Sequence, residues 1–88
     1  MENAAVCVGH TAYFLCDING DPLPDYEWFH DGMTLNNTTR FNMRRNSKYS
    51  RLRIINTKTT DSGEYTCKAF NAAAVLTTSG RLRVTTDC

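Results

Sequence analysis

The sequence predicts an all-β fold in which two antiparallel sheets pack face to face as a sandwich. Most candidate strands alternate apolar and polar residues, the pattern of a sheet with one buried and one exposed face. The stretch from Asp61 to Cys67 adds a turn followed by a strand, in which Tyr65 and Cys67 are two residues apart and share a strand face. A Tyr in this position after a turn is typical of a tyrosine corner, whose hydroxyl hydrogen-bonds to the backbone a few residues upstream.

Four strands are predicted in the first half of the chain, at residues 1–8, 11–17, 26–30 and 33–35. The segment between the second and third is a loop, because Asn19-Gly20 and two prolines interrupt it and proline cannot donate to a strand ladder. Asp31-Gly32 is a tight turn signal between the third and fourth. Side chains alternate along a strand, so Trp28 and Phe29 face opposite sides of the sheet.

Four more strands are predicted in the second half: residues 40–45, residues 50–56, the central strand after the turn at Gly63, and residues 75–85. In the second of these, Leu52 and Ile54 face inward, and Arg51 and Arg53 face outward. The segment from Asn71 to Ala74 is the tip of the last hairpin.

Length and composition limit the function classes. We expect the 88 residues to form one domain, and four cysteines in so short a chain fit an oxidising compartment. The formal charge of +1 argues for neither wholesale nucleic-acid binding nor an acidic partner. No apolar run approaches the roughly 18 residues of a membrane span, and no signal-peptide core follows Met1. We therefore expect residues 1–88 to be one domain excised from a larger, extracellular multidomain protein.

The chain resembles an immunoglobulin domain of the intermediate (I-set) type over essentially its whole length. The matching positions are Gly9, Cys16, Gly20, Pro22, Pro24, Trp28, Phe29, Leu52, Ile54, Asp61, Gly63, Tyr65, Cys67, Asn71, Leu82 and Val84. The resemblance implies a cross-core disulfide between Cys16 and Cys67, with Trp28 packed on it. It also implies core positions at Leu52, Asp61 and Tyr65.

The resemblance leaves Cys7 to pair with Cys88, which would clamp the two ends of the domain. The alternative is that Cys88 belongs to a neighbouring domain and that Cys7 bonds elsewhere. At Thr57 the family usually has Val or Leu, so a slightly under-filled core end is expected there.

Within this family, two stretches are similar to the immunoglobulin domain of ROR-type receptor tyrosine kinases, which respond to Wnt ligands: Ser50–Ile54 and Thr59–Gly63. The stretch Asp61–Lys68 is about as similar to the neuregulin immunoglobulin domain, which carries basic residues and binds heparan sulfate. The Cys7/Cys88 pair departs from the ROR pattern.

Three surface features are candidate functional sites. Asn36 and Asn37 both begin an N-x-[ST] sequon in a polar loop, which suits a glycan, although such sequons also arise by chance. Phe29 and Phe70 are predicted on one sheet and form a candidate partner patch; the alternative is that they pack against surface aliphatic stems. The third feature is a run of cations proposed to bind sulfated glycosaminoglycan: Arg40, Arg44, Arg45, Lys48, Arg51 and Arg53. The alternative for these cations is a solvated face that discourages edge pairing.

No catalytic constellation, cofactor motif or metal-ligand spacing is recognised in the sequence. The main hypothesis is therefore a non-catalytic extracellular recognition or adhesion module of a cell-surface receptor or secreted signalling protein. Its partner would be a protein ligand or co-receptor. The alternatives are a heparan-sulfate-binding domain of a growth-factor-type protein and a cytosolic structural module of a muscle-type filament protein.

Overall fold

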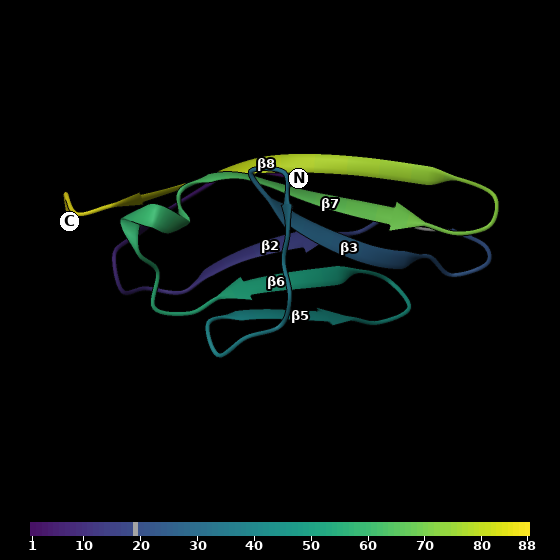
Figure 1. Ribbon diagram of the computed structural model, residues 1–88, viewed down its shortest axis with the longest axis horizontal. Helices are drawn as coiled ribbons and strands as arrows, with labels where there is room; N and C mark the ends of the chain where they lie inside the picture. Colours follow the sequence, from purple (N-terminus) through teal and green to yellow (C-terminus); the bar gives the residue numbers. More distant parts are fainter. Residues whose placement is uncertain (19) are drawn as a thin grey trace.

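The computed structural model describes residues 1–18 and 20–88, so the loop position predicted at Asn19 lies outside the described residues. In that part of the chain, eight strands and a short 3-10 helix form two sheets packed face to face (Figure 1). The elements are β1 Ala4–Cys7, β2 Ala12–Cys16, β3 Asp25–His30, β4 Met33–Thr34, β5 Phe41–Arg45, β6 Ser50–Ile54, η1 Thr59–Asp61, β7 Gly63–Phe70 and β8 Val75–Thr85. The predicted two-sheet sandwich is confirmed.

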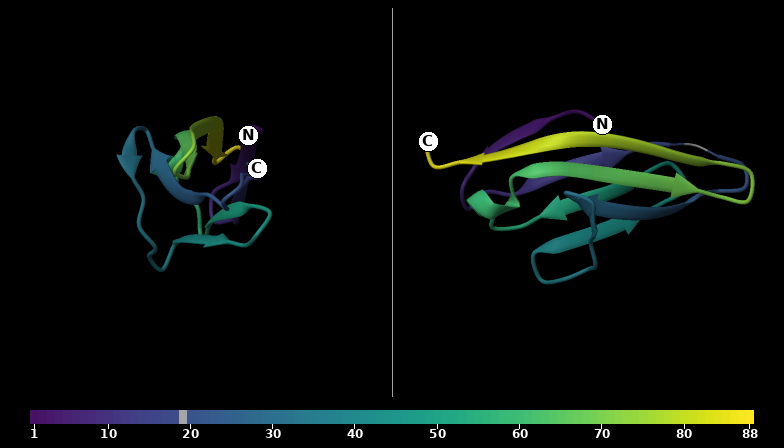
Figure 2. Two further views of the ribbon diagram at one scale, coloured as in Figure 1. Left: turned by 90° about the vertical axis from the view of Figure 1, so that its right-hand side faces the viewer. Right: turned by 45° about the horizontal axis from the view of Figure 1, so that its top comes forward.

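The five-stranded sheet has the order β1-β8-β7-β3-β4, and the three-stranded sheet has the order β2-β6-β5. β1 runs parallel to β8, with Cys7 opposite Thr85, whereas the other strand pairs are antiparallel. The molecule is elongated, with principal extents of 44 × 20 × 20 Å. Figure 2 shows β8 running along most of that length toward the C-terminus.

The core lies between the sheets because alternate residues of β2 and β6 on one sheet, and of β7 on the other, point inward. Trp28, Leu52, Ile54 and Tyr65 are among its largest buried side chains. Burial of each such side chain is worth about 1.5–3 kcal/mol relative to exposure. The predicted disulfide between Cys16 on β2 and Cys67 on β7 joins the two sheets, with its Cα atoms 6.3 Å apart.

Two tight turns join neighbouring strands. Between β3 and β4, Asp31 and Gly32 both have positive φ, at 48° and 84°, as a two-residue type I′ hairpin requires. Between β7 and β8, the Asn71 carboxamide oxygen accepts hydrogen bonds from the backbone N–H groups of Ala73 and Ala74 at 2.8 and 2.9 Å. An asparagine side chain thus organises the turn that ends at Ala74.

At Thr57, where the sequence predicts a slightly under-filled core end, the structure shows polar contacts. Thr57 is buried, and its hydroxyl donates to the His10 carbonyl at 2.8 Å. Its backbone N–H donates to the same carbonyl, and its own carbonyl accepts from Gly9 N–H. Thr57 therefore holds the β1–β2 turn against the sandwich, and its hydroxyl adds a hydrogen bond that Val or Leu could not make.

Candidate interaction surfaces

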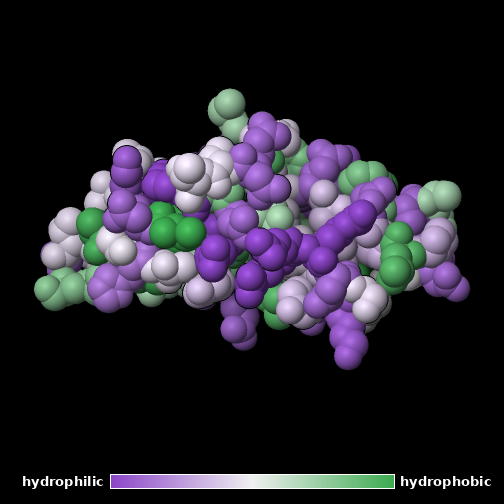
Figure 3. Space-filling view, turned by 90° about the horizontal axis from the view of Figure 1, so that it is seen from below, coloured by the Kyte–Doolittle hydropathy of each residue, from purple (hydrophilic) through white to green (hydrophobic). Residues whose placement is uncertain are grey.

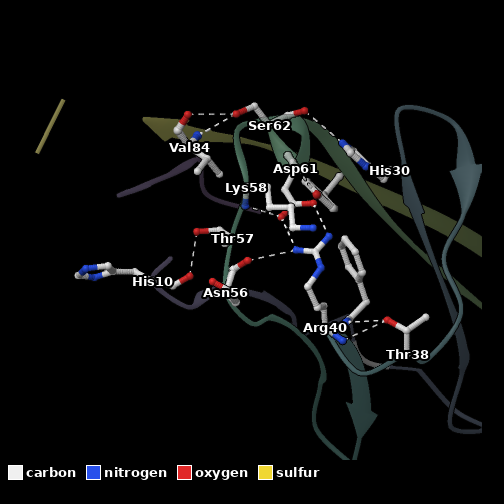
Figure 4. A network of polar contacts seen from close by, with 12 residues as sticks. His10, His30, Thr38, Arg40, Asn56, Thr57, Lys58, Asp61, Ser62 and Val84 are labelled. Carbon is white, nitrogen blue, oxygen red and sulfur yellow. Dashed lines mark hydrogen bonds and ion pairs between the residues drawn. The ribbon is translucent and has the colours of Figure 1, made fainter. Parts of the chain in front are cut away.

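A polar network closes the end of the sandwich at η1 (Figure 4). Arg40, just before β5, donates from Nη1 and Nη2 to the Asp61 carboxylate at 2.7 and 3.0 Å, and Nη1 also reaches the Asn56 carbonyl at 3.3 Å. The Asp61 carboxylate also accepts from Lys58 N–H at 2.8 Å. Burial alone would raise the pKa of Asp61, but the hydrogen bonds from Arg40 and Lys58 and the Arg40 charge outweigh it and lower that pKa.

Tyr65 forms the predicted tyrosine corner, because its hydroxyl donates to the Asp61 carbonyl at 2.6 Å. Burial, followed by the nearby Asp61 charge, raises the pKa of Tyr65 well above its ordinary value, so the hydroxyl stays protonated as a donor. The His30 ring stacks on Tyr65 with centroids 4.4 Å apart, and His30 Nε2 lies 3.2 Å from the Ser62 carbonyl. Backbone and side chains thus fix Asp61 from several directions.

Ion pairs reduce the number of unpaired cations in the predicted glycosaminoglycan site. Arg40 is committed to Asp61, and Arg45 pairs with Asp25 of β3 at 2.6 Å. Lys48 lies in the exposed β5–β6 turn that the Asn46 carboxamide organises. Of the six predicted cations, Arg44, Arg51 and Arg53 lie on the outer face of the three-stranded sheet.

The register explains how that outer face is built. Arg44 lies opposite Arg51, which lies opposite Leu15, and Arg53 lies between Asn42 and Tyr13. The Arg51 guanidinium carbon lies 5.8 Å from the centroid of the Tyr13 ring. Hydrophilic side chains gather along the middle of this face, as Figure 3 shows. The face is therefore basic along β5 and β6 and apolar along β2.

The predicted aromatic patch is divided in the structure. Phe29 lies opposite Thr66, whereas Phe70 lies opposite Asp25, so four residues, or about 13 Å, separate the two along the strands. Glu27 and Lys68 face each other between them, and the Lys68 ammonium lies 5.5 Å from the Phe70 ring centroid. Both rings are half-buried on the same sheet, but they are not one contiguous patch.

The two sequon asparagines differ in their contacts. Asn36 is exposed, and no hydrogen bond of its side chain occurs within the described residues. The Asn37 carboxamide oxygen accepts from Met43 N–H of β5 at 2.7 Å, and the next residue donates from Thr38 N to the Phe41 carbonyl at 2.8 Å. Asn37 therefore has a role in the fold that Asn36 lacks.

The structure places a disulfide between Cys7 and Cys88, with Cα atoms 6.0 Å apart and a sequence separation of 81 residues. The parallel β1–β8 pairing brings the two ends together, because it sets Cys7 opposite Thr85, three residues before Cys88. The bond fastens the edge strand β1 to the end of β8.

Two structural residues were not recognised in the sequence. Arg40 was assigned to the basic run, because a cation about 20 residues before a buried Asp indicates an ion pair only once the strand register is known. Ser50 is buried and accepts from Trp28 Nε1 at 2.8 Å, which satisfies the indole donor. The only indication of this contact in the sequence was a small polar residue at the start of a predicted strand.

The described residues contain no cluster of three or more His, Cys, Asp or Glu side chains arranged to hold a metal ion. Over the same residues, no helix has the length and apolar character needed to cross a membrane.

Comparison with known sequences decides the family. The sequence model described as Immunoglobulin I-set domain matches residues 1–84. The chain belongs to the immunoglobulin I-set family. The solved structure of Titin M4 shares its fold, with a TM-score of 0.94 and 25% identity over 97% of this chain and 88% of that chain. A similar likeness, with a TM-score of 0.91 and 26% identity over 96% of this chain and 85–86% of those chains, is found to two structures of the Titin M10–Obscurin like 1 Ig complex.

Curated I-set relatives fall into muscle and cell-surface proteins. The chain is 34% identical over 86 residues to Striated muscle preferentially expressed protein kinase of Danio rerio, covering 98% of this chain but 3% of that protein. It is 31% identical over 87 residues to mouse Cell adhesion molecule-related/down-regulated by oncogenes, covering 99% of this chain and 7% of that protein. It is 41% identical over 87 residues to human Pro-neuregulin-2, membrane-bound isoform, covering 96% of this chain and 10% of that protein.

These relatives correct the finer resemblance. They support similarity to neuregulin, but they do not support a ROR-type receptor kinase as the nearest relative. The match to a kinase is to a small part of that protein, and an I-set domain is generally non-catalytic. The relatives include adhesion and growth-factor proteins together with muscle proteins. Similarity to them indicates a protein-binding type of domain, but it does not decide between an extracellular and a cytosolic location.

Proposed function

We propose that this domain is a non-catalytic extracellular recognition module of a larger receptor, adhesion or signalling protein, and that it binds a protein ligand or co-receptor. The observation that carries the compartment is the second disulfide, Cys7–Cys88. Cytosolic thiols are kept reduced, so two disulfides in 88 residues favour an oxidising environment. Kinship to an adhesion protein and to neuregulin supports the same assignment.

Protein binding is supported by the complex between the titin M10 and obscurin like 1 domains, in which a domain of this shape meets a protein partner. On this chain, Phe29 is half-buried on the outer face of the sheet that contains β3, β7 and β8. Its neighbours there are Thr34 and Thr66, and Thr66 and Ser79 share a hydrogen bond at 2.9 Å between their hydroxyls. A half-buried aromatic ring surrounded by hydroxyl groups fits a protein contact in which the ring is the anchor.

A non-reducing peptide mass map of the domain secreted from animal cells tests the compartment. We expect peptides linked through Cys16–Cys67 and Cys7–Cys88, with a glycan on one sequon asparagine. Free thiols and bare asparagines in the protein isolated from its native source would instead support the cytosolic filament alternative, which the muscle relatives favour.

The second candidate is binding of heparan sulfate, which the outward Arg44, Arg51 and Arg53 favour. Because two of the predicted cations are ion-paired, the site would be smaller than the sequence indicated. The double variant Arg44→Glu/Arg51→Glu should elute from heparin at clearly lower salt than the control Arg81→Glu/Arg83→Glu, whose changes lie on the other sheet. Equal elution of the two variants would rule this candidate out.

A further inference from the structure

The link between β4 and β5 crosses the open side of the sandwich and is fastened at both of its ends. These two strands are edges of different sheets, and Figure 1 shows the link passing from one sheet to the other. At its start, Leu35 N–H donates to the Trp28 carbonyl of β3 at 2.8 Å. Two residues later, the Asn37 carboxamide oxygen accepts from Met43 N–H of β5 at 2.7 Å. Asn36 lies between these two attachments.

A groove of about 380 Å³ lies beside this link, and Asn36 is one of its lining residues. Leu35 and Met43, both half-buried, form part of its apolar lining, and Tyr26 and Trp28 of β3 line it as well. Pockets that hold small organic ligands have volumes of about 300–1,000 Å³. The groove therefore has room for a small ligand such as a sugar.

The edge of β3 supplies hydrogen-bonding groups to this groove. In the described part of the chain, β4 covers only Phe29 and His30 of β3. The Trp28 carbonyl binds Leu35 and thus points away from β7, and the polar groups of Tyr26, two residues earlier, point the same way. Trp28 N–H and the Tyr26 backbone have no hydrogen bond to any described residue. These N–H and C=O groups are therefore free to bind a ligand.

Asn36 places a sugar next to this edge. It begins an N-x-[ST] sequon, its side chain is exposed, and none of the described residues forms a hydrogen bond with that side chain. Because Asn36 follows Leu35, which is bound to Trp28, a sugar on the Asn36 carboxamide nitrogen would begin beside the open edge of β3. The Asn37 carboxamide, in contrast, is held at the edge of β5.

We propose that Asn36 carries an N-linked glycan and that its first N-acetylglucosamine lies in this groove. The acetamide and hydroxyl groups of the sugar match the free N–H and C=O groups of β3, and its ring C–H groups would contact Leu35 and Met43.

A lipid-pyrophosphate-linked oligosaccharide would supply the glycan during secretion. The Asn36 nitrogen bonds to C1 of the sugar and gives up a proton, while the C1–O bond to the pyrophosphate breaks and the lipid pyrophosphate leaves with the electron pair. The inference rests on the proposed extracellular function, because this transfer occurs on secreted chains.

A sugar in the groove would connect the two sheets, because it would contact β3 on one side and Met43 of β5 on the other. The unfolded chain has no such groove. The contacts would therefore stabilise the folded domain relative to the unfolded chain.

Peptide mass mapping of the domain secreted from animal cells locates the glycan, with enzymatic release in heavy-oxygen water marking the glycosylated asparagine. We expect Asn36 to carry the glycan in most molecules. Thr39→Ala removes only the Asn37 sequon and should leave this occupancy unchanged. A glycan chiefly on Asn37, or on neither asparagine, would overturn the proposal.

Hydrogen exchange and thermal unfolding test the groove, with Thr39→Ala as the background. With a glycan on Asn36, the Tyr26 and Trp28 amides should exchange at least about tenfold more slowly than in Asn36→Gln. The melting temperature should be higher by about 4 °C or more. Trimming the glycan to its first sugar should keep both effects. Equal exchange and equal melting temperatures would show that the sugar points into solvent, and would overturn the proposal.

Two controls separate the groove from other effects. In protein made in bacteria, which carries no glycan, Asn36→Gln should not change the melting temperature; a change would assign the effect to the asparagine itself and overturn the proposal. Adding Lys48→Asn to Asn36→Gln moves the sequon to the exposed β5–β6 turn, where a glycan should produce neither effect. Equal stabilisation by the moved glycan would also overturn the groove contact.

The inference and the proposed function can fail separately. If both disulfides form and Asn36 carries no glycan, the inference is wrong and the extracellular assignment stands. Free thiols in the protein isolated from its native source would contradict the extracellular assignment and the inference together.

Discussion

Arg40 and Asp61 form a two-point ion pair, with Nη1–Oδ2 and Nη2–Oδ1 distances of 2.7 and 3.0 Å, that ties the start of β5 to η1. The Asp61 side chain is 5% exposed and the Arg40 side chain 26% exposed. Because the pair is removed from most of the solvent, losing one partner leaves a poorly hydrated charge.

Asp61→Asn should lower the free energy of unfolding by about 2 kcal/mol, below the full cost of breaking a buried pair because Arg40 keeps some contact with water. Urea unfolding at pH 7 measures this. A double-mutant cycle with Arg40→Met should give a coupling energy of about 1 kcal/mol or more. The matched control is Asp25→Asn, which breaks the exposed Arg45 pair and should cost less than about 1 kcal/mol. Equal costs for the two aspartates would contradict the assigned role of Asp61.

The same pair predicts a pH dependence. The pKa of Asp61 is lower in the folded protein than the value near 3.9 expected for an unfolded chain. Its contribution to stability is therefore fully present well above pH 4, and it is lost as the pH falls through the folded pKa. Urea midpoints measured between pH 7 and pH 2.5 should fall less steeply for Asp61→Asn than for the unaltered domain, whereas Asp25→Asn should keep the steep fall. Parallel profiles for all three proteins would rule out this linkage.

Tyr65→Phe tests the tyrosine corner. The change removes the hydroxyl that donates to the Asp61 carbonyl at 2.6 Å and leaves that buried acceptor without its partner. The expected cost is roughly 1–3 kcal/mol, measured by thermal or denaturant unfolding. Tyr13→Phe removes a hydroxyl from an exposed ring and should be neutral within about 0.5 kcal/mol. The prediction fails if Tyr65→Phe is as neutral as the control.

The elements that could be predicted from the sequence are those with local signals. The alternation in β2 and β6, the Asp31-Gly32 turn and the Asp61–Cys67 corner each depend on neighbouring residues, and the structure confirms them. The ion pairs of Arg40 with Asp61 and of Arg45 with Asp25 join residues about 20 apart, so local sequence does not indicate them. Fewer cations of the basic run are therefore unpaired than the sequence indicated. The hydrogen bond of the Thr57 hydroxyl likewise could not be predicted from local sequence, because its acceptor lies in the β1–β2 turn.

The terminal disulfide should stabilise the domain through the size of the loop it closes. With a sequence separation of 81 residues, the chain-entropy estimate is about 4 kcal/mol. The double variant Cys7→Ser/Cys88→Ser should therefore unfold at clearly lower denaturant while keeping the Cys16–Cys67 bond. Hydrogen exchange should also accelerate at β1 before the core strands, because β1 is held by β8 and by this bond. An unchanged denaturation midpoint would show that the bond contributes little beyond the strand pairing.

Asn36 and Asn37 should differ in the folded protein although both satisfy the sequon. Asn37→Ala removes the acceptor for Met43 N–H and uncovers the outer edge of β5, so exchange of the Met43 amide should accelerate and stability should fall by about 1 kcal/mol. Asn36→Ala is the matched control, because no hydrogen bond of the Asn36 side chain occurs within the described residues, and in the unglycosylated domain it should leave that amide and the stability unchanged. Asn37→Asp keeps an acceptor oxygen and should restore most of the protection at neutral pH. Similar exchange in both alanine variants would mean that backbone pairing alone protects the β5 edge, and that the Asn37 side chain is dispensable there.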